Sequence, residues 1–495
     1  MPQDRSWLRA LARSVRPAWS SRNVDLVLAA RVSMSAGRSL AGVLVPIYLA
    51  LQGFTGLELA AYVLVVAATS AILSLVIGTI SDQVGRRPFL VVLPLVTAAA
   101  GLAFAFSRSD PLLFVMGALG SLGRGSGAGA GAVGPYQPAE SAFVTEILPS
   151  RFRNAAFGRL SFSSSLGAMV GSLLALLVPS AHLHGAAATA IFRDGFLAVT
   201  IASALAGLIA LGLTEPGRRP AAAAVPTAPD APAPDTAAPD TAAPDILATE
   251  PESTAPVALA GRSAARLTWP RLPTRSRWLL YRLWITNSLN GVAVGMFGPF
   301  VTYWFFRRFG ASAAQVGVLF AVINAATMVS SLSAARLADR WGLVRTVTIM
   351  RTAQALLLVP MVLAPTFAIA GGVYFVRMVV QRIGLPLRQS YALGLADPAE
   401  RGSVAALSNV PSQVAMAASP LLTGYLMDEA SLALPFELAA LFQFLNATSF
   451  WVLFHRYPPE EERERAQQGL RSAPEVALAP ETTMPAREGQ DRAGQ

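Results

Sequence analysis

The stretch that decides the fold reads Gly78-Thr-Ile-Ser-Asp82-Gln-Val-Gly85-Arg86-Arg87 and follows directly on a run of apolar residues. Far along the chain a second stretch reads Ala335-Arg-Leu-Ala-Asp339-Arg-Trp-Gly342-Leu-Val-Arg345, again at the end of an apolar run. In both stretches an Asp precedes a Gly by three residues. This repeated spacing, at the same place in each part of the chain, indicates two related halves.

Apolar runs dominate the rest of the sequence. Of 495 residues, 53% are hydrophobic and 14% are charged, and a helix needs about 20 apolar residues to cross a bilayer. We find twelve such runs, at residues 24–51, 60–80, 89–106, 112–133, 155–178, 195–213, 278–306, 316–338, 344–364, 367–387, 404–427 and 434–454. They predict an all-α integral membrane protein with twelve transmembrane helices in two pseudo-symmetric six-helix bundles.

The composition between the runs predicts the domain organisation. Residues 1–23 form a basic N-terminal tail, 24–213 the first bundle, 214–276 a linker rich in Ala, Pro and Asp, 277–455 the second bundle, and 456–495 a C-terminal tail. The linker and the C-terminal tail are too poor in large apolar residues to bury a core, so we expect both to be disordered.

Arginine placement predicts the orientation, because positive charge is retained on the cytoplasmic side. Arg residues gather in the N-terminal tail and in the loops after the second and fourth runs, whereas the alternate loops of the first half carry Arg108 and Arg193. Both termini are therefore expected in the cytoplasm, although Arg307 and Arg308 then lie outside. All 39 basic residues are Arg, a bias typical of a GC-rich bacterial genome, so we expect the bacterial plasma membrane.

The first quoted stretch resembles the signature of the major facilitator superfamily, Gly-x-x-x-Asp-x-x-Gly-Arg-Arg or Lys, which lies between the second and third helices. The resemblance implies a transporter in which Asp82 acts as a conformational latch, with Arg151 or Arg401 as its charge partner. Gly78 is expected to allow close helix approach and Gly85 a tight turn, while Arg86 and Arg87 hold the loop in the cytoplasm. The second copy keeps Asp339, Gly342 and Arg345 but has Ala335 in place of the first Gly, so it is expected to latch less strongly.

Charged residues inside the apolar runs are candidates for a substrate cavity, because a charge in lipid is costly. They are Arg31, Arg38, Arg124, Arg377 and Arg382. At about 1.5 Å per residue, Arg31 lies roughly 10 Å and Arg38 roughly 21 Å into the first run. With Ser35 they share one helix face, which we expect to point inward. The alternative is that Arg31 extends to the membrane surface and that Arg124 and Arg382, at matching positions of the fourth and tenth runs, hydrogen-bond neighbouring helices.

Acidic partners for these arginines are not evident in the first eleven runs, so the buried cations are expected to lack them and to favour an anionic substrate. Asn287, Asn290 and Asn324 complete the polar candidates. Glu140, placed near the cytoplasmic end of the fourth helix, is the best proton carrier available, with a structural cap as its alternative role.

These patterns favour a secondary transporter that moves a small organic solute, anionic or amphipathic, by alternating access. Efflux is favoured over uptake, with proton or anion coupling. The alternatives are a non-transporting membrane sensor or scaffold with the same fold, and a lipid flippase. Three His and no Cys supply little catalytic material, so an enzyme is not expected. We expect a monomer whose partners are the lipid bilayer and a small-molecule substrate, with no nucleic acid, cofactor or metal.

Overall fold

The computed structural model describes residues 21–123, 134–179, 186–215, 275–330, 342–397 and 407–457, together with Glu400 and Val404. Every regular element in these ranges is a helix. Eight of the described helices are long and apolar enough to cross a membrane, and the others are shorter, more polar or broken.

The first half contains α2 (Arg22–Leu51), α3 (Gly56–Val84), α4 (Arg87–Phe106), α5 (Asp110–Gly120), α6 (Tyr136–Ile147), α7 (Ser150–Leu174), η2 (Ala175–Leu177) and α8 (Ala186–Leu211). The second half contains α9 (Arg277–Phe297), η3 (Gly298–Phe300), α10 (Val301–Phe309), α11 (Ala313–Ser330), α13 (Leu343–Leu363), α14 (Phe367–Gly394), α16 (Val410–Glu429) and α17 (Leu434–Phe454). Each predicted apolar run thus corresponds to one helix or to a broken pair of helices.

Two predicted runs are broken. The seventh is interrupted by the 3₁₀ turn η3, where Pro299 has no backbone N–H to donate to the preceding turn. The fourth ends as α5 at Ser121, whose φ of 52° is left-handed, and resumes as α6 at Tyr136. The predicted end of this run at residue 133 is therefore wrong. Hydropathy alone does not reveal that the more polar segment beyond it forms the helix α6.

Helix α2 is the centre of the first bundle and is buried along most of its length. It packs on α7 and α8, and α7 approaches it through glycine. A Cβ on Gly167 or Gly171 would collide with the backbone of Val32 or Ala36, so the small residues spaced four apart bring the two backbones together, as expected for this spacing. In the second bundle α9 packs on α16 and α17, and α13 packs on α14 and α17.

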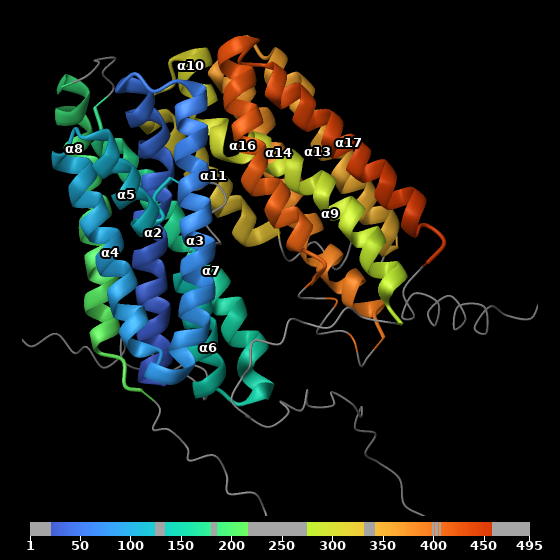
Figure 1. Ribbon diagram of the computed structural model, residues 1–495, viewed down its shortest axis with the longest axis horizontal. Helices are drawn as coiled ribbons and strands as arrows, with labels where there is room; N and C mark the ends of the chain where they lie inside the picture. The colour runs from blue at the N-terminus through green and yellow to red at the C-terminus, as the bar shows by residue number, and fades with distance from the viewer. Residues whose placement is uncertain are drawn as a thin grey trace, which may run out of the picture.

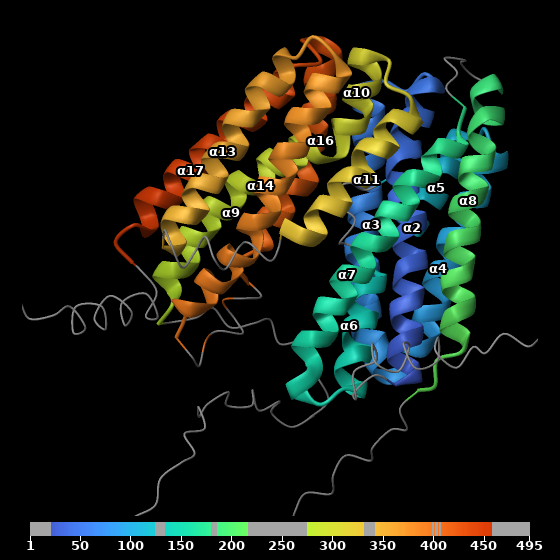
Figure 2. The same ribbon diagram turned by 180° about the vertical axis from the view of Figure 1, so that it is seen from behind.

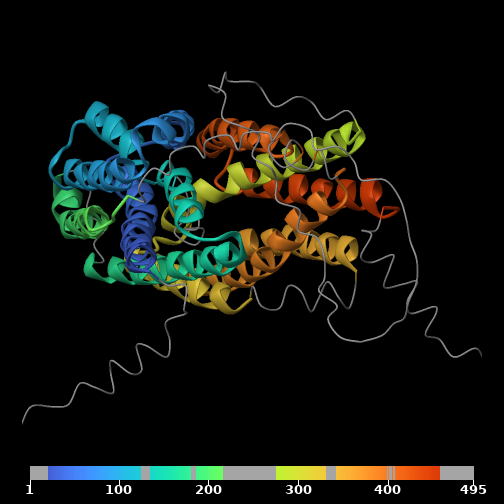
Figure 3. The same cartoon turned by 90° about the horizontal axis from the view of Figure 1, so that it is seen from below.

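The two halves meet at one end and diverge toward the other (Figures 1 and 2). Helix α3 packs on α16, α7 on α11, and α2 on α10. Seen from the end at which α2 and α9 begin, the blue-to-green helices of the first half and the yellow-to-red helices of the second form separate groups (Figure 3). We call the end where the halves meet the closed end and the other the open end.

Candidate functional site

A cavity of about 170 Å³ lies between the two halves. The first half contributes Arg31 from α2 and Glu140 from α6, and the second half contributes Asn324 from α11 and Arg382 from α14. All four residues were candidates from the sequence, and the fold brings them together from helices far apart in the chain.

Arg31 and Glu140 form an ion pair inside the protein. Arg31 Nη1 donates to Glu140 Oε2 at 2.5 Å, and the two side chains are 6% and 2% exposed. The expectation that the buried arginines lack acidic partners is therefore wrong for Arg31. The expectation failed because the predicted fourth run ended too early. Helix α6 follows that run, and Glu140 is its fifth residue. Breaking such a pair by removing one charge typically costs about 3–5 kcal/mol.

The second oxygen of this carboxylate has no hydrogen-bond partner among the described residues. Glu140 Oε1 is buried and accepts no hydrogen bond from the residues that the structure describes. A buried acceptor without a donor is unfavourable.

Hydroxyl and amide groups make up much of the remaining cavity wall. Ser161 and Ser165 lie one turn apart on α7, so they share a face, with Ser164 beside them. Ser164 shares a 3.1 Å hydrogen bond with Ser35 of α2. Gln137 and Ser141 of α6 are also lining residues, and the described apolar ones are Phe157 and Leu160.

Arg38 has a different place from Arg31. Its Nη2 donates to Ser121 O at 3.0 Å, where α5 ends. A Cβ on Gly134, two residues before α6, would lie 3.2 Å from the same nitrogen. Arg38 thus joins the two pieces of the broken fourth run and is not among the described lining residues of the cavity. Because α2 and α6 run in opposite directions, Arg38 lies at the break while Arg31, two turns away, reaches Glu140.

The remaining candidates of the second half lie within its bundle. Asn287 donates to Ser408 O at 2.8 Å, and Asn290 accepts from Asn446 at 3.4 Å. The Arg377 guanidinium lies 4.2 Å from the centre of the Phe297 ring, a cation–π contact. Arg124 lies outside the described residues.

Sequence reasoning missed Arg351 of α13. It is buried, donates to Asn446 Oδ1 and lies 5.0 Å from the centre of the Phe450 ring. The signal was present, because Arg351 interrupts the ninth apolar run two turns after its start, just as Arg31 interrupts the first.

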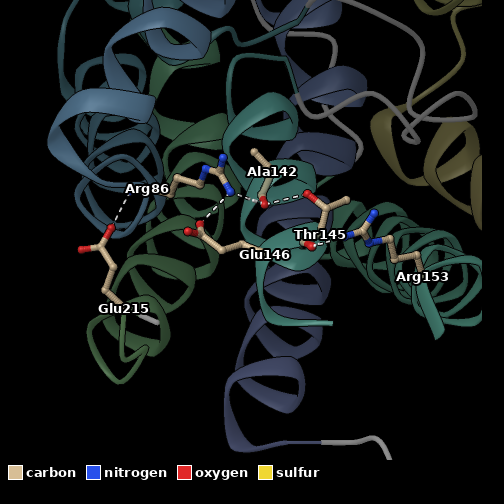
Figure 4. A network of polar contacts seen from close by, with 6 residues as sticks. All are labelled: Arg86, Ala142, Thr145, Glu146, Arg153 and Glu215. Atoms are coloured by element: carbon tan, nitrogen blue, oxygen red, sulfur yellow. Dashed lines mark hydrogen bonds and ion pairs between the residues drawn. The ribbon is translucent and has the colours of Figure 1, made fainter. Parts of the chain in front are cut away.

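The signature stretch forms a network at the open end (Figure 4). Arg86 Nη1 donates to Ala142 O and to Glu146 Oε2, and the Arg86 backbone N–H donates to Glu215 Oε1 at 2.8 Å. Arg87 donates to Leu211 O, in the last turn of α8. Both arginines thus satisfy carbonyl groups near helix C-termini, where positive charge is favourable. Arg153 does the same for Thr145 O.

The two glycines of the signature differ in what the described structure shows of them. Gly85 ends α3 with φ +109°, so the predicted tight turn is confirmed. No described atom lies within 4 Å of a Cβ placed on Gly78, and the close helix approach expected there remains a hypothesis.

Parts of both signature copies lie beyond what the structure describes. The side chain of Asp82 falls there, as do Asp339, Arg401 and the side chain of Arg151, so the latch and its charge partners remain a hypothesis. In the second copy Gly342 precedes α13 with φ +80°, and Arg345 is exposed in its first turn.

Two helical bundles with a polar cavity between them define a membrane transporter. The model of the Major Facilitator Superfamily matches residues 27–280 and 283–486, most of the chain. The chain therefore belongs to the Major Facilitator Superfamily and is a multi-pass membrane transporter of the alternating-access type, not an enzyme.

Solved transporters share this fold at low sequence identity. A bacterial homologue of the human lysosomal transporter Spinster, inward-facing and occupied, has a TM-score of 0.61 and 13% identity over 88% of this chain and 97% of its own. The nucleoside transporter NupG gives 0.61 and 13% over 88% and 99%. The human organic anion transporter MFSD10 gives 0.52 and 18% over 88% and 100%. No curated protein matches the chain in sequence.

Proposed function

We propose that this protein is a secondary transporter for a small organic anion and that the cavity between the halves is its substrate site. The observation that carries the proposal is the charge of this cavity: two arginines, Arg31 and Arg382, and one carboxylate, Glu140, come from both halves. A site formed by both halves exists only in one relative placement of the halves, so binding of a solute is coupled to their relative motion.

The ion pair supports an anionic substrate over a cationic one. Glu140 pairs with Arg31, and Arg382 brings a second guanidinium to the described wall from the other half. Guanidinium groups donate charge-assisted hydrogen bonds to anions, so a wall with two of them and one carboxylate favours an anion over a cation. The human organic anion transporter with this fold shows that the architecture can carry organic anions.

Glu140 is the group we propose for proton coupling. Protonation removes the negative charge that holds Arg31, so the arginine is released to bind an anion. Return of the proton to solvent restores the pair and expels the anion. In this scheme proton and substrate occupy the site together. Anion exchange, with a second anion in place of the proton, is the alternative.

We propose export from the cytoplasm, driven by the outward concentration gradient of the solute and accompanied by the proton, in a monomer of the bacterial plasma membrane with both termini inside. The arginine-rich loops support this orientation, which makes the open end cytoplasmic. The cavity then faces solutes of the cytosol.

The test is anion flux in proteoliposomes with neutralised cavity residues. Arg382→Gln is expected to lower flux at least about tenfold, the loss typical of a charge-assisted contact. Arg31→Gln alone leaves Glu140 unpaired and is expected to destabilise the fold, so the double variant Arg31→Gln/Glu140→Gln removes both charges of the pair and tests the same point. Arg308→Gln, an exposed arginine of α10, is the matched control. Flux in the cavity variants equal to that of the control would refute the proposal.

Coupling is tested in the same vesicles. An anion gradient is expected to drive proton movement in the wild type, and Glu140→Gln is expected to abolish it while anion exchange persists. Unchanged proton movement in this variant would assign coupling elsewhere. Binding of anions without any flux would favour the sensor or scaffold, and lipid translocation would favour a flippase.

A further inference from the structure

We propose that an anionic phospholipid binds this transporter where the start of α9 meets the end of α17. These two ends lie beside one another at the outer edge of the second half, away from the first half (Figures 1 and 3). None of the residues described there lines the cavity between the halves. The site is therefore separate from the proposed substrate site, and its partner is a lipid of the surrounding membrane.

Arg282 of α9 is held against two aromatic rings at this junction. Its guanidinium carbon lies 4.9 Å from the centre of the Trp278 ring and 4.7 Å from the centre of the Tyr457 ring. Its Nη1 donates to Leu453 O at 3.1 Å, in the last turn of α17. Two cation–π contacts and a hydrogen bond thus fix the position of the guanidinium.

Arg282 keeps further donors for an anion. A guanidinium carries five N–H groups in a planar fork, and the hydrogen bond to Leu453 is the one that Arg282 makes with the described residues. The side chain is half-buried, and none of its nitrogens is buried without a partner. Such a fork can donate to two oxygens of one phosphate at once.

Two more arginines add positive charge to this surface. Arg277 Nε donates to the Tyr281 hydroxyl at 3.0 Å, and its guanidinium lies 5.5 Å from the centre of that ring. Arg456 precedes Tyr457 and is exposed. Within the described ranges, none of Arg277, Arg282 and Arg456 forms an ion pair with a carboxylate. The described surface therefore has a positive charge to which an anion is attracted.

The nearby carboxylates have other partners or are the alternative occupant. Glu400 accepts hydrogen bonds from the backbone N–H groups of Arg275 and Ser276, and Asp397 pairs with the Arg275 side chain. Three acidic residues, 460–462, follow the end of α17 in the sequence. An acidic segment of the chain and a lipid headgroup would compete for the same arginines, and the exposed residues around them favour the lipid.

These exposed residues are aromatic and apolar. Trp278 and Tyr281 are 40% and 44% exposed, and Ile285, one turn further along α9, is 52% exposed. On α17, Trp451 and Val452 are exposed as well. Trp and Tyr gather at the interface between membrane and water, with apolar residues on the lipid side of them. The surface therefore fits a molecule that has both a charged headgroup and acyl chains, and not a soluble anion.

Charge also selects among phospholipids. Phosphatidylglycerol carries a net negative charge, whereas phosphatidylcholine adds a quaternary ammonium to the same phosphate. A quaternary ammonium can bind aromatic rings, but guanidinium groups already lie over the rings of Trp278, Tyr281 and Tyr457 and would repel it. Basic groups at the cytoplasmic ends of transmembrane helices attract anionic lipids of the inner leaflet, where the proposed orientation places this surface.

The experiment measures lipid binding to the full chain in detergent by native mass spectrometry, with phosphatidylglycerol and phosphatidylcholine of the same acyl chains. Phosphatidylglycerol is expected to bind at least about tenfold more tightly, because each arginine near an anionic headgroup contributes about fivefold. It is also expected to raise the midpoint of thermal unfolding more than phosphatidylcholine does, since a ligand of the folded state stabilises it. Equal affinity for the two lipids would overturn the proposal.

Arginine variants locate the site. Arg282→Gln is expected to weaken phosphatidylglycerol binding about fivefold, and Arg277→Gln/Arg282→Gln about twenty-fivefold, with phosphatidylcholine binding unchanged. Arg193→Gln is the matched control, because Arg193 is exposed and lies 5.1 Å from the centre of the Phe106 ring, in the first half. Variants that unfold at a lower temperature with either lipid, and keep the wild-type affinity for phosphatidylglycerol, would contradict the proposal and leave Arg282 a structural contact between α9 and α17.

Replacement of the acidic residues tests the alternative occupant. In the variant Glu460→Gln/Glu461→Gln/Glu462→Gln, the affinity for phosphatidylglycerol is expected to stay close to that of the wild type. Binding of phosphatidylglycerol that appears only in this variant would show that the acidic segment, and not a lipid, covers the arginines.

Discussion

At each end of the molecule a carboxylate caps the N-terminus of a helix. At the closed end the capped helix belongs to the other half, and at the open end it belongs to the same half. At the closed end the Asp428 carboxylate of α16 accepts hydrogen bonds from the backbone N–H groups of Gly56 and Leu57, at 2.7 and 2.8 Å. It therefore caps the N-terminus of α3, in the other half. At the open end the Glu400 carboxylate accepts from the N–H groups of Arg275 and Ser276, at the start of α9 in its own half.

This difference shows which contacts have to break during transport. The Arg86 network joins α3, α6 and the residues after α8, all in the first half. A rocking motion of the halves leaves such contacts intact, whereas it has to pull Asp428 off α3. The described contacts of the open end thus stabilise each bundle, and those of the closed end stabilise one state of the transporter.

Substitution of a glycine at the closed end is expected to have the largest effect on the opening of that end. A Cβ on Gly424 would collide with Gly56 O, and a Cβ on Gly317 would collide with Ser172 O, in each case across the halves. Gly424→Leu is expected to force the closed end apart at a cost of about 1–3 kcal/mol to the closed form.

The chain has no cysteine, so a single cysteine at Leu57 reports opening by its labelling rate. That rate is expected to rise at least about fivefold in Gly424→Leu. Gly372→Leu, at an exposed glycine with no described atom within 4 Å of its Cβ, is the control. Equal labelling in the two variants would show that the glycine contact does not hold the end shut.

The Asp428 cap gives an intermediate effect. Asp428→Ala removes the acceptor for two N–H groups, and loss of a helix cap typically costs about 1 kcal/mol. Since Asp428 is exposed, the cysteine at Leu57 is expected to be labelled about fivefold faster, not more. Glu429→Ala, at the next residue, serves as the control. A rate unchanged from wild type would mean that water replaces the cap without loss.

Loss of the Arg86 network is expected to give the smallest effect of the three changes. Arg86→Gln removes its contacts with Glu146 and Ala142, and Glu146 is 45% exposed, so the loss in unfolding free energy is expected to stay below about 1 kcal/mol. Thermal unfolding in detergent measures it. Labelling at Leu57 is not expected to rise, because the network lies within one half. A rise comparable to that of Asp428→Ala would contradict the separation of roles between the two ends.

Hydropathy was enough to predict the helices, because a run of about 20 apolar residues has few alternatives in a membrane. It failed at the fourth run, where the helix ends at Ser121 and resumes at Tyr136 in more polar sequence. Because of that error, Glu140 was expected near the membrane surface, and its ion pair with Arg31 was not predicted.

The types of residue that line the cavity were predictable from the sequence, but which of them contact one another was not. Arg31, Asn324 and Arg382 were candidates because polar residues in a membrane are costly. Their meeting with Glu140 depends on the register of helices more than a hundred residues apart, which no local pattern records. Arg38 shows the same limit: its depth indicated function, and its contact is with the break in the fourth run.

The most direct test of alternating access measures both ends of the same molecule. Spin labels on cysteines at Leu57 and Ala430 report the closed end, and labels at Pro149 and Arg456 report the open end; all four residues are exposed. When the transported solute is added, we predict that the first distance lengthens in the same population of molecules in which the second shortens. Distances that stay fixed, or that lengthen together, would contradict the account.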